Sequence, residues 1–185
     1  LDRQSQRLRK LTEDLVEASK ASTGNIPVSP APTDLNVLLS QVCGEYQQRL
    51  EDQVLEPVLA LCQPGPVAMA DGRLLWRVLD NLMSNICKYA MPGTRAYLST
   101  EAGEDGVRMV VKNISRYPLN ISADELTERF VRGDSSRSTE GSGLGLSIAT
   151  SLTAIQGGDF RLTIDGDLFK VTLTLPRAEQ KEKQE

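Results

Sequence analysis

Apolar residues recur every three or four positions in four stretches of the chain, a spacing that places their side chains on one face of an α-helix. The predicted helices cover residues 1–22, 35–49, 72–90 and 144–155. In the first helix charged side chains cover the other faces, so the apolar stripe is narrow. It consists of Leu8, Leu11, Leu15 and Ala18. A helix exposed on so many sides needs a partner for stability.

Two interpretations of this first helix remain open. It either lies on the main domain or forms one helix of a helical bundle or dimer stem. The narrow, heptad-like stripe favours the stem. The next segment favours it too, because residues 23–33 contain three prolines and a glycine, which stop the helix and predict a semi-extended linker. We therefore place a domain boundary in this linker.

Six short segments have the composition of β-strands: residues 54–61, 66–70, 95–101, 107–112, 159–164 and 169–175. Pro57 confines the first of them to a sheet edge or an irregular position. Glycine-containing turns separate the third strand from the fourth and the fifth from the sixth, which predicts two hairpins. Helices and antiparallel hairpins thus alternate without β-α-β spacing. This order predicts an α+β fold with helices on one face of a mixed sheet.

Composition narrows the class of protein. The 185 residues are 39% hydrophobic and 25% charged, which suits a domain with a real core. A formal net charge of -4 argues against a general nucleic-acid binder. The three cysteines have no C-x-x-C spacing and are typical of buried, reduced thiols in the cytosol. No apolar run is long enough to span a bilayer.

Histidine is absent from the chain. Its absence excludes His-based acid–base chemistry, His metal ligation and Ser–His or Cys–His pairs within these residues. The chain begins at Leu1, inside a predicted helix, so we expect it to be a fragment of a longer protein.

Glycines at alternate positions, Gly141, Gly143 and Gly145, lead directly into the last predicted helix. Such a loop leaves backbone N–H groups uncovered at a helix N-terminus, where the helix dipole adds a positive partial charge. This combination suits a polyphosphate. The spacing is neither that of the Rossmann fingerprint nor that of a P-loop, and a tight turn explains the glycines equally well on their own.

Asn81, Asn85 and Lys88 are spaced to share one face of the helix that follows Asp71, while Leu82 and Ile86 face the core. Asparagine is a poor residue for a helix interior, so two of them on one stripe suggest a function. An amide oxygen is a suitable ligand for Mg²⁺, and an ammonium group attracts phosphate. The pattern predicts a site for a metal-bound phosphate group.

Four segments resemble, in order, the motifs of sensor histidine kinases of two-component systems. Residues 81–90 resemble the N box, residues 128–130 and 132–138 the F box and ATP lid, residues 141–146 the G2 box, and residues 169–176 the closing strand. The resemblance covers residues 33–176, and four motifs in the right order rarely coincide by chance. Residues 11–19 look like the second helix of that family's dimerisation stem.

The resemblance implies a two-layer α/β sandwich of the Bergerat (GHKL) type that binds Mg-ATP and is preceded by one stem helix. It divides the chain into a truncated stem helix (1–22), a Pro-rich linker (23–33), a catalytic ATP-binding domain (34–177) and a charged, disordered tail (178–185). The full protein would be a homodimer in the cell membrane, with this part in the cytoplasm.

Roles follow from the resemblance motif by motif. Asn85 would ligate Mg²⁺ with Asn81 beside it, Lys88 would approach the phosphates, and Tyr89 would lie close to the nucleotide. In the lid, Arg137 would reach the phosphates with support from Arg132. The backbone of the glycine-rich corner would cradle the phosphates through Gly141, Gly143, Leu144, Gly145 and Leu146.

Asn81 separates this chain from the ATP-hydrolysing branch of the superfamily, which has a glutamate there as general base. An amide cannot accept that proton, so the site should hold ATP without hydrolysing it efficiently. The γ-phosphoryl group would pass to a histidine on a stem helix outside this chain, and then to an aspartate of a response regulator. The fragment alone would not phosphorylate itself.

Residues 112–116 depart from the family pattern, in which an aspartate of the G1 box binds the adenine amino group and two glycines follow. Asn113 stands in the position of that aspartate and offers only a neutral acceptor. This departure is the one feature that favours an alternative function, a non-catalytic nucleotide-sensing or scaffolding module. A structural alternative for Asn113 itself is that it merely caps a strand.

Overall fold

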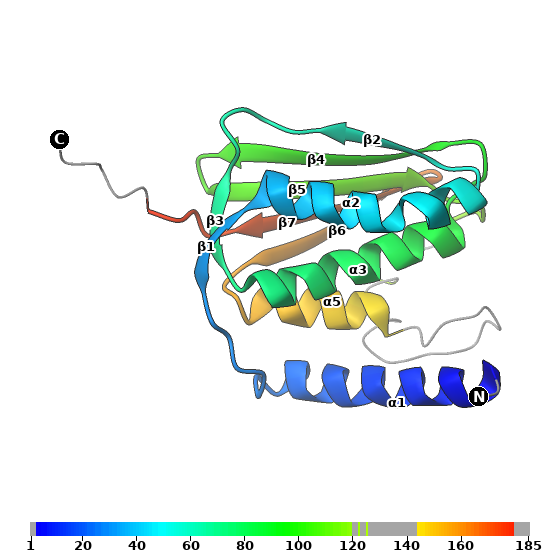
Figure 1. The fold of residues 1–185 in the computed structure, drawn as a ribbon, viewed down its shortest axis with the longest axis horizontal. Coiled ribbons are helices and arrows are strands. Elements are labelled where there is room, and N and C mark those ends of the chain that lie inside the picture. The colour runs from blue at the N-terminus through cyan, green and yellow to red at the C-terminus, as the bar shows by residue number, and fades with distance from the viewer. Residues whose placement is uncertain (1–2, 120–121, 123–124, 126–143, 180–185) are drawn as a thin grey trace.

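The computed structural model describes residues 3–119, 122, 125 and 144–179. Its centre is a five-stranded mixed sheet with the strand order β2-β4-β5-β7-β6 (Figure 1). The strands are β2 (Glu56–Ala60), β4 (Arg95–Gly103), β5 (Gly106–Ile114), β6 (Asp159–Asp165) and β7 (Leu168–Leu175). All neighbours pair antiparallel except β2 and β4, which are parallel.

Three helices cover one face of this sheet: α2 (Leu35–Asp52), α3 (Gly72–Tyr89) and α5 (Gly145–Ala154). Side chains alternate along β5, since Val107, Met109 and Val111 are buried while Arg108 and Lys112 are partly exposed. These inward side chains meet buried leucines of the helices in one continuous hydrophobic core. The expected mixed sheet with helices on one face is therefore confirmed.

Strand β2 lies at the edge of the sheet, where Pro57 predicted it. The expectation that no β-α-β connection occurs was wrong at this edge. The chain passes from β2 to its parallel neighbour β4 through β3 (Val67–Ala70) and α3. This β-α-β connection was missed because the strand directly before α3 is β3, which does not belong to the main sheet. Strand β3 pairs with β1 (Ala31–Asp34) in a separate two-stranded sheet.

Asp71 fixes the start of α3, as its predicted role of N-cap requires. One carboxylate oxygen accepts from the N–H groups of Arg73 at 3.0 Å and Leu74 at 3.3 Å, and the other accepts from Ser29 at 3.0 Å. Its own N–H donates to the Gln156 side chain at 2.9 Å. Burial alone favours the protonated acid, but the donating N–H groups outweigh it and hold the pKa of the Asp71 carboxyl below its usual value.

Helix α1 (Arg3–Ser22) lies alongside α5, at the edge of the helical layer (Figure 1). The predicted apolar stripe is split between two faces. Ala18 packs against the core, with Ala21 buried one turn later, whereas Leu8 and Leu15 remain 66% and 60% exposed. Helix α1 therefore rests on the domain, as one of the two interpretations expects, and presents two leucines to the solvent.

Two local expectations need comment. The tail was expected to be disordered from Ala178, yet Ala178 is buried and its N–H donates to the Val67 carbonyl at 3.0 Å. The cysteines are free, and burial raises the pKa of the Cys43 and Cys87 thiols, as expected of apolar filler, while Cys62 is half-buried.

Among the described helices, none has the length and hydropathy needed to cross a membrane.

Candidate nucleotide-binding site

Helix α3 presents the predicted polar stripe at the surface of the domain. Leu82 and Ile86 are 2% exposed and face the core, whereas Asn81 and Asn85 are half-buried and Lys88 is exposed. The amides are therefore not turned into the interior. Three or four residues separate successive members of the stripe, so they follow one side of the helix over two turns.

Asn81 adjoins the first residue of α5. A Cβ atom built on Gly145 would lie 3.2 Å from the Asn81 Oδ1 atom, closer than an ordinary van der Waals contact. The side-chain Nδ2 of Asn81 donates to the Arg77 carbonyl at 3.1 Å, which leaves Oδ1 on the side of α5. A glycine at position 145 thus allows the beginning of α5 to approach the amide stripe of α3.

The first turn of α5 has the environment expected for an anion. Its N-cap position is Leu144, which makes no side-chain cap hydrogen bond, and no acidic residue occurs in the first turn. Leu146 is buried and anchors this turn in the core. The positive end of the α5 dipole therefore lies directly beside Asn81. Gly141, Gly143, Arg132 and Arg137, predicted for the same site, lie outside the described residues, as do the F box and the lid.

Asn113 lies inside β5, paired with Phe169 of β7, so it does not simply cap a strand. It is 5% exposed and two residues beyond Val111, hence on the face that the helices cover. Its Nδ2 atom donates to the Ile114 carbonyl at 3.3 Å, and the carbonyl of the amide is its only side-chain acceptor.

Backbone contacts join the C-terminal end of α3 to the residues that follow β5. The Arg116 N–H donates to the Tyr89 carbonyl at 2.7 Å, and Ala90 forms a β-bridge with Ser115. This fastening brings the segment with Lys88 and Tyr89 next to the segment with Asn113. The structure therefore gathers on one side of the molecule the described members of three sequence motifs that lie far apart along the chain.

Residues 70–179 match the family model described as "Histidine kinase-, DNA gyrase B-, and HSP90-like ATPase". The chain belongs to this family. Within it, the fold and the relatives identify an ATP-binding catalytic domain of the sensor histidine kinase type. The resemblance inferred from the motifs is thereby confirmed at the level of family and domain.

Two curated relatives illustrate the similarity. A probable sensor protein, PcoS of Escherichia coli, is 30% identical over 91% of this chain and 36% of its own length. The sensor protein VanSC of Enterococcus gallinarum is 30% identical over 94% of this chain and 48% of its own length. The chain thus spans between about a third and a half of these proteins. Names of this kind give no support to the non-catalytic alternative.

Solved structures agree. The histidine kinase AdeS of Acinetobacter baumannii superposes with a TM-score of 0.75 at 20% identity, over 95% of this chain and 81% of that one, which establishes the fold. Full-length ShkA in complex with AMPPNP superposes with the same TM-score of 0.75 at 27% identity, over 95% of this chain and 38% of that one.

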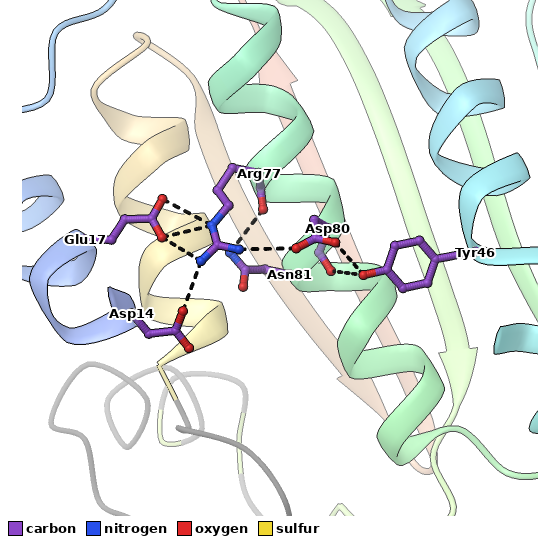
Figure 2. A network of polar contacts seen from close by, with 6 residues as sticks. All are labelled: Asp14, Glu17, Tyr46, Arg77, Asp80 and Asn81. Atoms are coloured by element: carbon purple, nitrogen blue, oxygen red, sulfur yellow. Dashed lines mark hydrogen bonds and ion pairs between the residues drawn. The ribbon is translucent and has the colours of Figure 1, made fainter. Parts of the chain in front are cut away.

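A cluster of charged residues beside the site was not singled out from the sequence (Figure 2). It joins Asp14 and Glu17 of α1 to Arg77 and Asp80 of α3, and Asp80 to Tyr46 of α2. One feature of the sequence could have indicated this cluster. Asp14 falls among Leu11, Ala18 and Ala21 at helical spacing, and an acid on a face that packs against a domain needs a cationic partner.

Proposed function

We propose that this chain is the ATP-binding part of a sensor histidine kinase that transfers the γ-phosphoryl group of Mg-ATP to a histidine and then to an aspartate of a response regulator. The family and the named relatives support the proposal. The 185 residues contain no histidine, so the acceptor would lie outside them, on another stem helix. We further propose that the whole protein is a membrane-anchored homodimer with this part on the cytoplasmic side.

The observation that carries the proposal is the contact between Asn81 and Gly145. It joins a stripe of amides to the N-terminus of α5, an arrangement that suits a polyphosphate with a bound metal ion. Because the residue at this position is asparagine and not a carboxylate, it orients a ligand but cannot remove a proton from water. Such a site retains ATP for a separate acceptor.

The donor set fits magnesium. The Asn85 amide oxygen, one turn beyond Asn81, is a hard neutral ligand of the kind that Mg²⁺ accepts together with phosphate oxygens. Bound magnesium would neutralise charge on the β- and γ-phosphates. The complex of ShkA with AMPPNP supports a nucleotide in a fold of this kind.

The chain's own residues would then act by binding and orientation. The Lys88 ammonium would approach the phosphates, and Tyr89 would lie close to the nucleotide. Asn113 would accept a hydrogen bond from the adenine amino group through its carbonyl oxygen. From the resemblance, Arg137 and Arg132 would add positive charge from the lid, and Gly141, Gly143 and Leu144 to Leu146 would offer backbone N–H groups. Catalysis would rest on positioning and electrostatics.

Radiolabelled ATP tests the proposal. The chain alone should bind Mg-ATP but take up no phosphoryl label, whereas adding a stem segment that contains the acceptor histidine should give a label that is stable in alkali and lost in acid. Calorimetry with the chain and with Asn113→Asp provides the binding arm, and the carboxylate should strengthen the adenine contact. Label on the isolated chain, rapid steady release of phosphate, or no binding at millimolar ATP would contradict the proposal.

A further inference from the structure

One buried side chain of the candidate site has an oxygen atom without a partner. Asn113 is only 5% exposed, and its Nδ2 atom donates to the Ile114 carbonyl at 3.3 Å. No described residue donates to its Oδ1 atom. In the described part of the chain, no fully enclosed side-chain oxygen lacks a hydrogen bond, so Oδ1 must reach an accessible surface. A buried amide whose acceptor is open in this way is placed to bind a ligand.

The hydrogen bond that this amide already makes is weak. At 3.3 Å it is longer than an ordinary N–H···O hydrogen bond. The Ile114 carbonyl also accepts from the Met91 N–H at 2.9 Å, so it keeps a partner without Asn113. The terminal torsion of an asparagine side chain is broad and roughly twofold, and the two ends of its amide are nearly equal in size. The amide can therefore turn over in place at the cost of one long hydrogen bond.

The backbone that carries Asn113 is fixed on both sides. Asn113 itself pairs with Phe169 in the central sheet. Two residues later, the Ser115 N–H donates to the Asp167 carbonyl at 2.7 Å. The Ser115 hydroxyl donates to the Tyr117 carbonyl at 2.7 Å and accepts from the Tyr117 N–H at 3.2 Å. Adaptation to different ligands at this place must therefore come from the side-chain amide.

Purine bases differ at an edge that one amide can recognise in either form. Adenine presents an N–H donor at position 6 and an acceptor at N1, whereas a 6-oxopurine such as hypoxanthine or guanine presents an acceptor at position 6 and a donor at N1. In one orientation the Asn113 amide accepts from the adenine amino group, and turned over it donates to the 6-oxygen. An ionised carboxylate at this position could only accept, and it would repel the 6-oxygen.

We propose that the Asn113 amide turns to match either edge, so that this site binds 6-oxopurine nucleoside triphosphates as well as ATP. The inference rests on the proposed function, because it takes the base of the nucleotide to lie at Asn113. Selectivity between the two classes should be small. Each base makes neutral hydrogen bonds to the same amide, and only the long bond to Ile114 is lost on turning.

Calorimetry of the 185-residue chain with Mg-ATP and Mg-ITP tests the proposal, because these nucleotides differ only at the edge in question. ITP should bind within about tenfold of ATP. The triphosphate of purine riboside, which has no group at position 6, should bind about three- to tenfold more weakly than ATP. A larger preference for ATP over ITP would overturn the inference. Purine riboside triphosphate that bound as tightly as ATP would overturn it too, since the amide would then make no contact with position 6.

The variant Asn113→Asp provides the second arm. It should bind ATP more tightly than the wild type does and should prefer ATP over ITP by at least about a hundredfold, because the carboxylate has no proton to donate. The matched control is Asn25→Asp, the same change of amide to acid at an exposed position before β1, and it should keep the wild-type ratio. A folded Asn113→Asp protein with the wild-type ratio would show that the base does not lie at Asn113.

The measurements on the wild type decide the inference even if Asn113→Asp does not fold. Rejection of ITP beside normal binding of ATP contradicts the inference alone and leaves the proposed function intact. Absence of binding by all three nucleotides at millimolar concentration contradicts the proposed function and the inference together.

Discussion

Among the described helices, α5 packs against α3 and α1, and these two contacts are built differently. Against α3, both helices contribute fully buried side chains to the common core, among them Leu75, Leu79, Ile148 and Leu152. On the other side, α1 contributes two alanines and relies on charges that reach Arg77. A buried leucine contributes about 1.5–3 kcal/mol, whereas a partly exposed ion pair such as Arg77–Glu17 contributes roughly 0–1 kcal/mol.

The difference separates a permanent contact from a reversible one. The apolar α3–α5 contact positions Asn81 against Gly145, and loss of this contact would disrupt the core. The polar contact of α1 exchanges protein partners for water at little cost. A nucleotide site that must stay assembled while a neighbouring helix moves is expected to use the two kinds of contact in this way.

Truncation of the apolar contact should have the largest effect. Leu79 is fully buried in α3, so Leu79→Ala should lower the free energy of unfolding by about 2–5 kcal/mol. Urea denaturation followed by circular dichroism measures this change. The control Leu8→Ala, at a position 66% exposed on α1, should lie within about 0.5 kcal/mol of the wild type. Similar losses for the two variants would remove the distinction between the contacts.

Asp71 provides a second test of the comparison, because it is a buried charge at the start of α3, one of the two helices of the permanent contact. Asp71→Ala should cost about 1–3 kcal/mol of unfolding free energy at pH 7, since it leaves N–H groups of Ser29, Arg73 and Leu74 without their acceptor. The folded pKa lies below the unfolded value of about 3.9. The ionised carboxylate therefore stabilises the fold above pH ~4, and this contribution is lost as the pH falls through the folded pKa.

Denaturation of wild type and Asp71→Ala at pH 7 and pH 3 checks the sign. The difference in unfolding free energy between the two proteins should be smaller at pH 3 than at pH 7. A larger difference at pH 3 would show that Asp71 does not stabilise the fold through its charge.

Gly145→Ala probes the site at the permanent contact. The added Cβ would meet Asn81 Oδ1 at 3.2 Å and displace the amide, at a cost of about 1 kcal/mol, or about fivefold in Mg-ATP affinity. Calorimetry measures the affinity. In the control Gly44→Ala, the new methyl group meets nothing within 4 Å on α2, so binding should be unchanged while stability rises slightly. Undiminished binding by Gly145→Ala would show that ATP binding does not depend on this close approach.

Salt should have the smallest effect and should act on the reversible contact alone. Raising the ionic strength from about 0.05 to 0.5 M shortens the screening length to a few ångströms and weakens the partly exposed pairs of Arg77. Hydrogen exchange in α1 should accelerate a few-fold, with α3 and α5 unaffected. In Asp14→Ala/Glu17→Ala the salt effect should vanish. Equal acceleration in all helices would indicate general destabilisation instead.

The fold was predictable where information is local. The stripe of leucines and the cap at Asp71 fix α3 within one segment, and Pro57 places β2 at an edge. The parallel pairing of β2 with β4 was not predictable, because it depends on where β3 finds its partner β1. Alternation along a strand identifies its faces but not its neighbours.

The candidate site, like the fold, has one part that was predictable from local spacing and one part that was not. Helical spacing alone put Asn81, Asn85 and Lys88 on one stripe. The approach of Asn81 to Gly145, which lies 64 residues further along the chain, followed only from the resemblance to a family. The partners of Arg77 were missed, since Asp14 lies 63 residues away and nothing in the local pattern of α3 calls for it. Pairings of this kind depend on how helices pack, which the sequence pattern does not specify.

The segment after α1 sets how far that helix can travel. The Asn25 N–H still bonds to the Lys20 carbonyl at 2.9 Å, and the Ser29 N–H is held by Asp71, so the tether between these two anchors is only four residue steps long. Fully stretched, it spans about 14 Å. Release of α1 is consequently a swing about its C-terminal end and not a departure. Because the helix is about 30 Å long, a rotation of about 20° around that pivot sweeps its far end through roughly 10 Å.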